Sequence, residues 1–112
     1  MRIRPRFKLW FVDENDEYVF GHGTMRLLAE IDRLGSISAA TRALGMSYRY
    51  ALERITIVEA RLGRPLVART RGGESGGGAK LTALGHEILE DYKGMEDSLQ
   101  QLTKWSTELS DD

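Results

Sequence analysis

The sequence predicts a mainly α-helical domain with small β elements, and three observations lead to this fold class. Apolar residues recur at helical spacing over most of the chain, whereas short aromatic and β-branched runs occur beside turn-forming segments. The 112 residues are the length of one ordinary domain, and no internal repeat divides them. The chain is 41% hydrophobic and 29% charged, as is usual for soluble globular proteins. We therefore expect one domain over residues 1–112.

The N-terminal residues predict a β-hairpin. Two runs rich in aromatic and β-branched residues, FKLWFV at 7–12 and EYVFG at 17–21, flank the turn-forming segment DEND at 13–16. Runs of this kind on either side of a polar turn pair as two antiparallel strands.

Three helices are predicted next, because three hydroxyl residues that suit the N-cap position each precede a helical stretch that ends at a glycine. The stretches cover about 24–34, 36–44 and 47–62. The third has a buried stripe at offsets of four, seven and eleven residues from Ala51. The predicted N-caps are Thr24, Ser36 and Ser47, and the predicted stops are Gly35, Gly45 and Gly63.

A second hairpin and a long helix are predicted to complete the chain. The runs PLVART at 65–70 and AKLT at 79–82 lie on either side of a glycine-rich loop. From Thr82, another suitable N-cap, an amphipathic helix is expected to run to about Leu109. About 25 residues of helix span ~38 Å, more than a small domain needs to cover its own core, so a partner helix is expected. The expected dimer-interface residues are Ile88, Tyr92, Met95, Leu99, Leu102 and Trp105.

The run ISAATRALGMSYRYALERI, at 37–55, has the organisation of a helix-turn-helix: a short helix with small residues, a glycine turn and a capped second helix. In such a unit the second helix enters the major groove of DNA with its N-terminal residues at the base edges. An ordinary helical hairpin with a polar exposed face would give a similar pattern. The side chains that would face bases or phosphates are Ser47, Tyr48, Arg49, Tyr50 and Glu53.

The net charge of −1 conceals a strong segregation of charge along the chain. Residues 42–71 hold seven arginines and two acids, and residues 1–12 hold four basic side chains and no acid. Residues 72–112 hold nine acids and three basic side chains. Clustering on solvated faces would produce this pattern, and so would a surface that binds a polyanion. Arginine is well suited to bidentate contacts with phosphate and guanine.

Three further sequence features give the chain a specific resemblance to a known protein family. These are GSIS at 35–38, GMSY at 45–48, and the glycine-rich TRGGESGGGAKLT at 70–82 with Gly85 after it. Over roughly residues 20–102 the chain resembles the N-terminal domain of the ModE family of molybdate-responsive transcriptional regulators, and more distantly the LysR-type DNA-binding domain. Thr41 stands where such units often have alanine, a change that the fold should absorb.

The resemblance implies a winged helix-turn-helix with an N-terminal β-hairpin and a long C-terminal dimerisation helix. It places the helix-turn-helix at about 36–62, the wing at about 65–82 and the dimerisation helix at about 83–109. It also implies a homodimer on a roughly palindromic double-stranded DNA operator. The DNA contacts implied are Ser36 and Ser38 at the second helix, Ser47, Tyr48, Arg49 and Arg54 on the third, and Arg69, Arg71 and Lys80 at the wing.

ModE proteins continue into a C-terminal oxyanion-binding region that this sequence does not include. We therefore expect no molybdate-sensing part and no cofactor in these residues, and a separate effector-sensing protein is one possible partner. The absence of cysteines and of a membrane span or signal peptide leads us to expect a cytoplasmic protein.

No enzyme site is predicted. The glycine-rich loop lacks the P-loop pattern, because Lys80 is followed by a leucine and the loop joins two strands instead of opening a helix. His22 and His86 have no partner at metal-ligand spacing. The alternative to a DNA-binding regulator is a protein–protein interaction module that uses the long helix and the acidic 72–112 segment.

Overall fold

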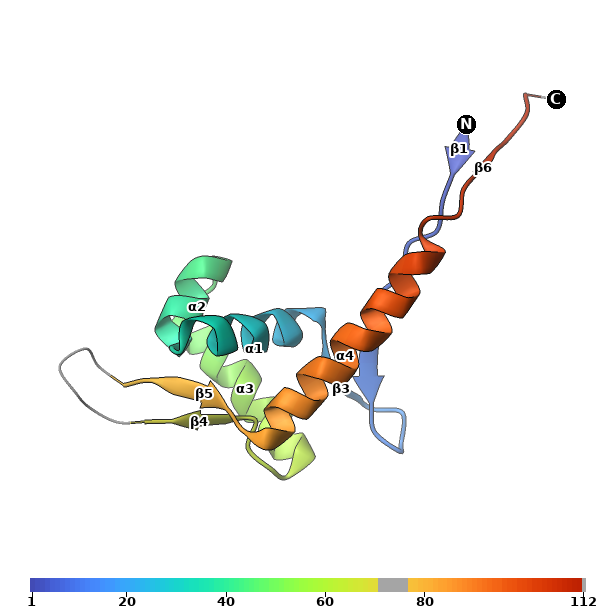
Figure 1. Ribbon diagram of the computed structural model, residues 1–112. Helices are drawn as coiled ribbons and strands as arrows, with labels where there is room; N and C mark the ends of the chain where they lie inside the picture. The colour runs from blue at the N-terminus through green and yellow to red at the C-terminus, as the bar shows by residue number, and fades with distance from the viewer. Residues whose placement is uncertain (71–76, 112) are drawn as a thin grey trace.

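A computed structural model describes residues 1–70 and 77–111 (Figure 1). The molecule measures 67 × 33 × 22 Å, and α4 extends away from a body of three helices and the wing (Figure 1). The elements, in chain order, are β1 (Arg2–Ile3), β2 (Trp10–Val12), β3 (Tyr18–Gly21), α1 (His22–Leu34), α2 (Ile37–Leu44), α3 (Tyr48–Leu62), β4 (Val67–Arg69), β5 (Ala79–Leu81), α4 (Ala83–Leu102) and β6 (Thr107–Glu108).

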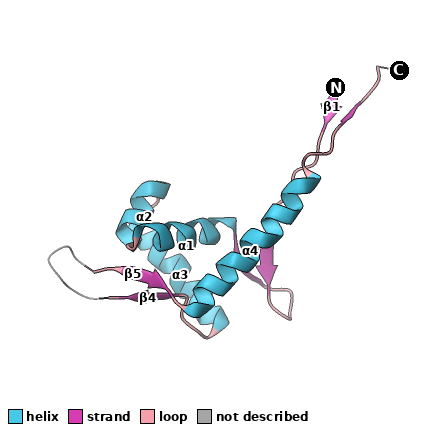
Figure 2. Cartoon of the chain, viewed as in Figure 1, coloured by secondary structure: helices cyan, strands magenta, loops and turns pink. Residues whose placement is uncertain are grey.

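Both predicted hairpins are present. β2 pairs antiparallel with β3, and β4 pairs antiparallel with β5 (Figure 2). In the second hairpin Val67 lies opposite Leu81, and both side chains are buried against the helical body. The two hairpins are separate two-stranded sheets.

Three of the four predicted N-caps are confirmed. The hydroxyl oxygens of Ser36, Ser47 and Thr82 each accept a hydrogen bond from the backbone N–H three residues later, at 3.1, 3.0 and 3.1 Å. The prediction for Thr24 is wrong: α1 begins at His22, and Thr24 is buried inside it. β3 leads directly into the helix, so the extended backbone of Gly21 makes the N-cap without a side-chain hydrogen bond.

The core lies between α1 and the elements packed around it. Leu28 and Ile31 of α1 are fully buried, together with Ala51 and Val58 of α3. An aromatic cluster extends this core toward the first hairpin and joins Phe11, Phe20 and Tyr92, with ring centroids 4.9 to 6.5 Å apart. Tyr92, on α4, is 1% exposed, and its hydroxyl donates to the backbone oxygen of Leu9 at 2.9 Å.

The end of α4 corrects the predicted helix. α4 stops at Leu102, and three hydrogen bonds of the tight i→i+3 kind close the turn at Thr103–Trp105. No glycine or proline marks this stop in the sequence, and the segment TKWST at 103–107 consists mostly of weak helix formers. Trp105 and Leu109 therefore lie outside the helix. α4 is a 20-residue helix about 30 Å long.

The two chain ends pair with each other, which the sequence did not predict. β1 runs antiparallel to β6, and the backbone N–H of Leu109 donates a hydrogen bond to the backbone oxygen of Met1 at 2.9 Å. Residues 1–9, here named the arm, run beside α4 from this pair down to the first hairpin (Figure 1). No helix among the described residues is long and apolar enough to span a membrane.

Candidate nucleic-acid interface

The N-terminal end of α3 is the centre of the candidate interface. Gly45, with φ of 68°, turns the chain out of α2, and the Ser47 hydroxyl then caps α3. Tyr48 and Arg49 in the first turn are exposed, and the Arg49 side chain is 91% exposed. The Arg49 Nε lies 3.6 Å from a carboxylate oxygen of Glu53, a solvated contact that leaves the guanidinium accessible.

The outward face of α3 contains more residues than the sequence predicts. Tyr48, Arg49 and Glu53 line a shallow hollow of about 440 Å³ together with three further residues. The six positions fall at offsets of 0, 1, 4, 5, 8 and 9 from Tyr48, which is one face of a helix. That spacing was visible in the sequence and could have identified the additional residues. The additional residues are Leu52, Thr56 and Ile57.

Tyr50 and Arg54 lie on another side of α3. They line a separate small cavity of about 140 Å³ that also contains Tyr18 and Thr24. This cavity faces the first hairpin and α1. The structure therefore divides the residues predicted on α3 into two groups, and only Tyr48, Arg49 and Glu53 share the outward hollow in the described part of the chain.

The start of α2 positions two predicted serines differently. The Ser36 hydroxyl accepts from the Ala39 N–H at 3.1 Å and so already serves as the helix cap. The Ser38 side chain is exposed, and its backbone oxygen accepts from the Thr41 hydroxyl at 2.8 Å. This bond satisfies the buried Thr41 hydroxyl, so the fold accommodates threonine there as expected.

The base of the wing is fixed to the helical body at two points. The backbone N–H of Ala79 donates a hydrogen bond to the backbone oxygen of Gly35 at 2.9 Å, beside the start of α2. The Glu59 carboxylate, near the end of α3, accepts from the N–H groups of Leu66 and Val67 at 2.7 and 3.1 Å. The wing is thereby oriented relative to both helices of the helix-turn-helix.

The predicted basic residues of the wing do not all lie on the same face of the hairpin. Arg69 lies opposite Ala79, and Lys80 lies opposite Ala68, so the two exposed cations project from opposite faces of the ribbon. They would contact different phosphates instead of holding one together. Arg71, the third predicted wing residue, lies outside the described residues.

The predicted dimer residues fall into three groups. Met95, Leu99 and Leu102 lie on one face of α4, and Met95 and Leu102 are 49% and 62% exposed. Ile88 is half-buried and packs against the chain's own core. Tyr92 is a correction, since it is buried in that core. Trp105 follows the helix and is 57% exposed, so its place at an interface stays a prediction.

A serine-capped helix, a short helix before it across a glycine turn, and a two-stranded wing define a winged helix-turn-helix domain. The model of the bacterial regulatory helix-turn-helix proteins of the lysR family matches residues 23–86, more than half of the chain. The protein belongs to this family. Because the family consists of regulatory proteins, the expectation that the chain is not an enzyme is confirmed.

Individual relatives support the resemblance to the ModE family. The molybdenum-pterin-binding protein MopB of Rhodobacter capsulatus is 39% identical over 82 residues, which are 73% of this chain and 30% of MopB. The DNA-binding transcriptional dual regulator ModE of Escherichia coli K12 is 37% identical over 87 residues, 77% of this chain and 32% of ModE. The chain spans about a third of the length of these curated relatives.

Solved structures confirm the fold. A crystal structure of the CbnR DBD–DNA complex matches with a TM-score of 0.56 at 24% identity, over 70% of this chain and 85% of that one. A crystal structure of CbnR, a LysR family transcriptional regulator, matches with a TM-score of 0.55 at 25% identity, over 70% of this chain and 26% of that one. The predicted winged helix-turn-helix is therefore correct.

Proposed function

We propose that this protein is a sequence-specific DNA-binding transcriptional regulator in which α3 enters the major groove. The observation that carries the proposal is the first turn of α3, where Tyr48 and Arg49 project from a helix whose cap is satisfied internally. A capped, rigid helix presents these groups with little conformational freedom left to lose on binding. Membership of the lysR-type family and the fold shared with a solved DNA complex support the same function.

The interface is divided between base and phosphate contacts. Arg49 is suited to a bidentate contact with guanine, and Leu52 and Thr56 in the same hollow are suited to a thymine methyl group. Ser38, Arg69 and Lys80 are suited to phosphate, since they are exposed at the flanks of α3. In this arrangement α3 supplies sequence discrimination and the flanks supply salt-dependent affinity.

The experiment selects bound genomic fragments and then measures the Kd for the selected duplex against salt concentration. A DNA-binding regulator loses affinity steeply, with a log–log slope of about −0.9 for each phosphate contact. Arg49→Ala is expected to weaken specific binding by about 1–3 kcal/mol. Arg64→Ala is the matched control, because Arg64 is exposed just beyond the opposite end of α3. No selected sequence, or equal losses in the two variants, would overturn the proposal.

The same proposal includes a homodimer. Met95, Leu99 and Leu102 form an apolar stripe at spacings of four and three residues along the part of α4 that extends from the body (Figure 1). Pairing two copies of this stripe would relate the two α3 helices by a two-fold axis, which matches the symmetry of a palindromic site.

Mass measurement by analytical ultracentrifugation tests the dimer. We expect a dimer at micromolar concentration, and a monomer when both Met95 and Leu102 are changed to glutamate. Glu87 and Asp97, exposed elsewhere on α4, provide a control pair as alanine variants. A native monomer, or a dimer that persists in the glutamate variant, would contradict dimerisation through this stripe.

A further inference from the structure

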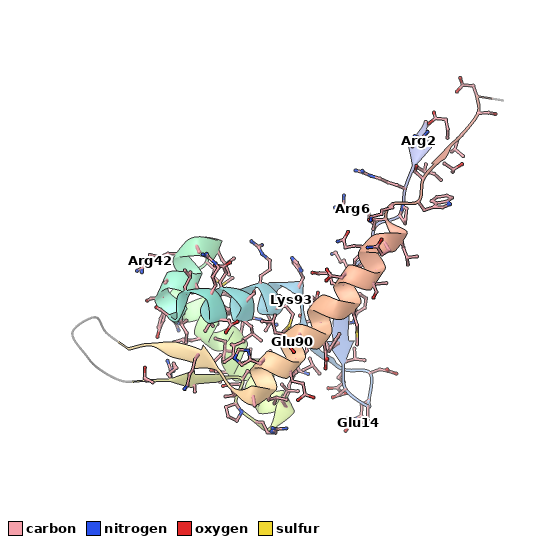
Figure 3. All side chains as sticks on the ribbon, viewed as in Figure 1. Arg2, Arg6, Glu14, Arg42, Glu90 and Lys93 are labelled. Carbon is pink, nitrogen blue, oxygen red and sulfur yellow. The ribbon has the colours of Figure 1, made fainter. Side chains whose placement is uncertain are left out.

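A cavity of about 720 Å³ lies between the arm and α4, away from the helix-turn-helix. Ligand-binding clefts in proteins have volumes of roughly 300–1,000 Å³. One wall comes from the arm and the first hairpin, and the other comes from α4 and the start of α1. Figure 3 shows Arg2 and Arg6 on the arm beside the upper end of α4, whereas Arg42 projects from α2 at the other side of the molecule.

The α4 wall of this cavity continues the face that the helix buries in the core. Gly85, Leu89 and Tyr92 are buried on that face. Steps of four, four and three residues onward from Tyr92 reach Glu96, Gln100 and Thr103, and all three line the cavity together with Tyr92. The face that α4 turns toward its own chain therefore changes from apolar to polar where the arm replaces the core as its neighbour.

The charge in the cavity is unbalanced. Arg4, Arg6 and Lys8 line it, and in the described part of the chain none of the three makes an ion pair or a hydrogen bond. The acid in the lining, Glu96, already contacts the His22 Nδ1 at 3.1 Å. Three cations without partners around one concave surface raise the local concentration of anions.

Four aromatic side chains also line the cavity. They are Phe7, Trp10, Tyr18 and Tyr92, and of these Trp10 and Tyr18 are 54% and 44% exposed. Aromatic walls with a few charged groups are the usual composition of a site for a small organic ligand. We propose that the cavity between the arm and α4 binds a small organic anion that has an aromatic or apolar body.

A DNA-phosphate contact is the competing explanation for the arm cations. The arm lies beside the far part of α4, and the α3 and wing surface lies toward the opposite end of the molecule (Figure 1). The cavity lining shares no residue with the outward hollow of α3. The geometry therefore favours a small ligand enclosed by the arm over an extended polymer.

The probe is 1-anilinonaphthalene-8-sulfonate, an aromatic anion that fluoresces when it leaves water. N-phenyl-1-naphthylamine has the same rings without the sulfonate and serves as the neutral control. We expect one sulfonate dye per chain, binding more tightly than the neutral dye, with energy transfer from Trp10 retained in Trp105→Phe. No binding, or equal affinity for the two dyes, would overturn the proposal.

Matched triple variants test the charge. Changing Arg4, Arg6 and Lys8 to alanine is expected to weaken sulfonate binding at least about tenfold. Changing Arg26, Arg64 and Lys93 to alanine removes equal charge outside the cavity and is expected to leave binding unchanged. Equal losses in both triple variants would contradict the site. Weaker DNA binding with unchanged dye affinity in the first variant would assign the arm to phosphate and overturn the proposal.

A second pair of variants applies if the triple variant does not fold. Gln100→Glu and Gln100→Lys change one exposed lining side chain to opposite charges and leave the helix intact. The glutamate is expected to weaken sulfonate binding and the lysine to maintain or strengthen it. Equal affinities would overturn the proposal. An affinity that falls as rising protein concentration promotes dimerisation would show that a second copy fills the cavity, which would also overturn it.

Discussion

The helix-turn-helix region, residues 36–62, and the arm beside α4 both present cations, but they are held in place by different forces. In the first, serine caps and glycine turns satisfy the backbone locally, and the contacts span a few residues. In the second, the contacts join residues 83 to 107 positions apart, as between Leu9 and Tyr92 or Met1 and Glu108. The first region is built on buried apolar residues, and the second depends mainly on exposed polar contacts.

This difference implies unequal stability within one chain. The arm and the β1–β6 pair have few buried apolar side chains, whereas α1 and α3 contribute fully buried ones. Regions with exposed hydrogen bonds and little apolar burial open at lower free energy than the core. A surface that contacts base edges requires a rigid support, and a ligand cavity under an arm requires an element that can open.

The largest expected effect is at Gly85, where α4 leaves the wing. A Cβ at this position would meet the backbone carbonyl of Leu66, which cannot move without displacing β4. We expect Gly85→Ala to lower the free energy of unfolding by about 3 kcal/mol, measured by denaturant titration. Gly94→Ala is the matched control on the same helix, because nothing lies within 4 Å of its Cβ position. That variant should gain about 0.5–1 kcal/mol, and a similar loss in both would refute the argument.

The second effect concerns the orientation of the wing. Glu59→Ala leaves the N–H groups of Leu66 and Val67 without their acceptor, and both residues are buried. We expect a loss of about 2 kcal/mol in unfolding free energy and weaker DNA binding, since the base of the wing is no longer fixed to α3. Glu53→Ala, on the same helix, should change stability by about 0.5 kcal/mol or less, because its ion pair is exposed. Equal stability losses would show that Glu59 does not hold the wing.

The sequence predicted the helix-turn-helix region well because its signals are local. Ser36 and Ser47 bond to amides three residues away, and Gly35 and Gly45 adopt the positive φ that glycine favours. Hairpin strands likewise adjoin their turns. The error at Thr24 arose because a preceding strand, not a side chain, starts α1.

The arm beside α4 could not be predicted in this way. The pairing of Arg2 with Glu108 joins two-residue strands at opposite ends of the chain, and no periodicity marks them. The sequence predicts that α4 continues past Leu102, because the stop of the helix uses Thr103 instead of a glycine. It also predicts Tyr92 at a dimer interface, because spacing along a helix cannot distinguish the chain's own core from a partner.

A smaller effect is expected at the contact between α4 and the arm. Tyr92→Phe removes the hydrogen bond to Leu9 and keeps the ring against Phe11 and Phe20. We expect the unfolding free energy to fall by about 1 kcal/mol. We also expect the substitution to accelerate amide hydrogen exchange more in the arm than in α3. Tyr48→Phe, at an exposed position, is the control and should leave both unchanged. Faster exchange in α3 by the same factor would mean that the two regions open together.

The same residue predicts a pH dependence. Burial, and then the nearby Glu96 and Tyr18, raise the pKa of Tyr92 above its ordinary value. The unfolded chain therefore loses this proton at lower pH than the folded one, and the stability that the protonated hydroxyl contributes is complete below about pH 10. Above that pH stability is expected to fall until the folded pKa is passed. Denaturant midpoints should decline less in Tyr92→Phe, and identical declines would contradict the assignment.

The smallest effect is expected where the chain ends meet. Glu108→Gln removes the ion pairs with the N-terminal amine and with Arg2, at 3.0 and 3.4 Å, and all three groups are exposed. Such pairs contribute about 0–1 kcal/mol and are screened by salt, so global unfolding should change by about 0.5 kcal/mol or less. Hydrogen exchange at residues 2–3 and 107–109 should accelerate, and added salt should have the same effect on the unchanged protein. A loss comparable to that of Gly85→Ala would place the chain ends in the cooperative core and remove the distinction between the two regions.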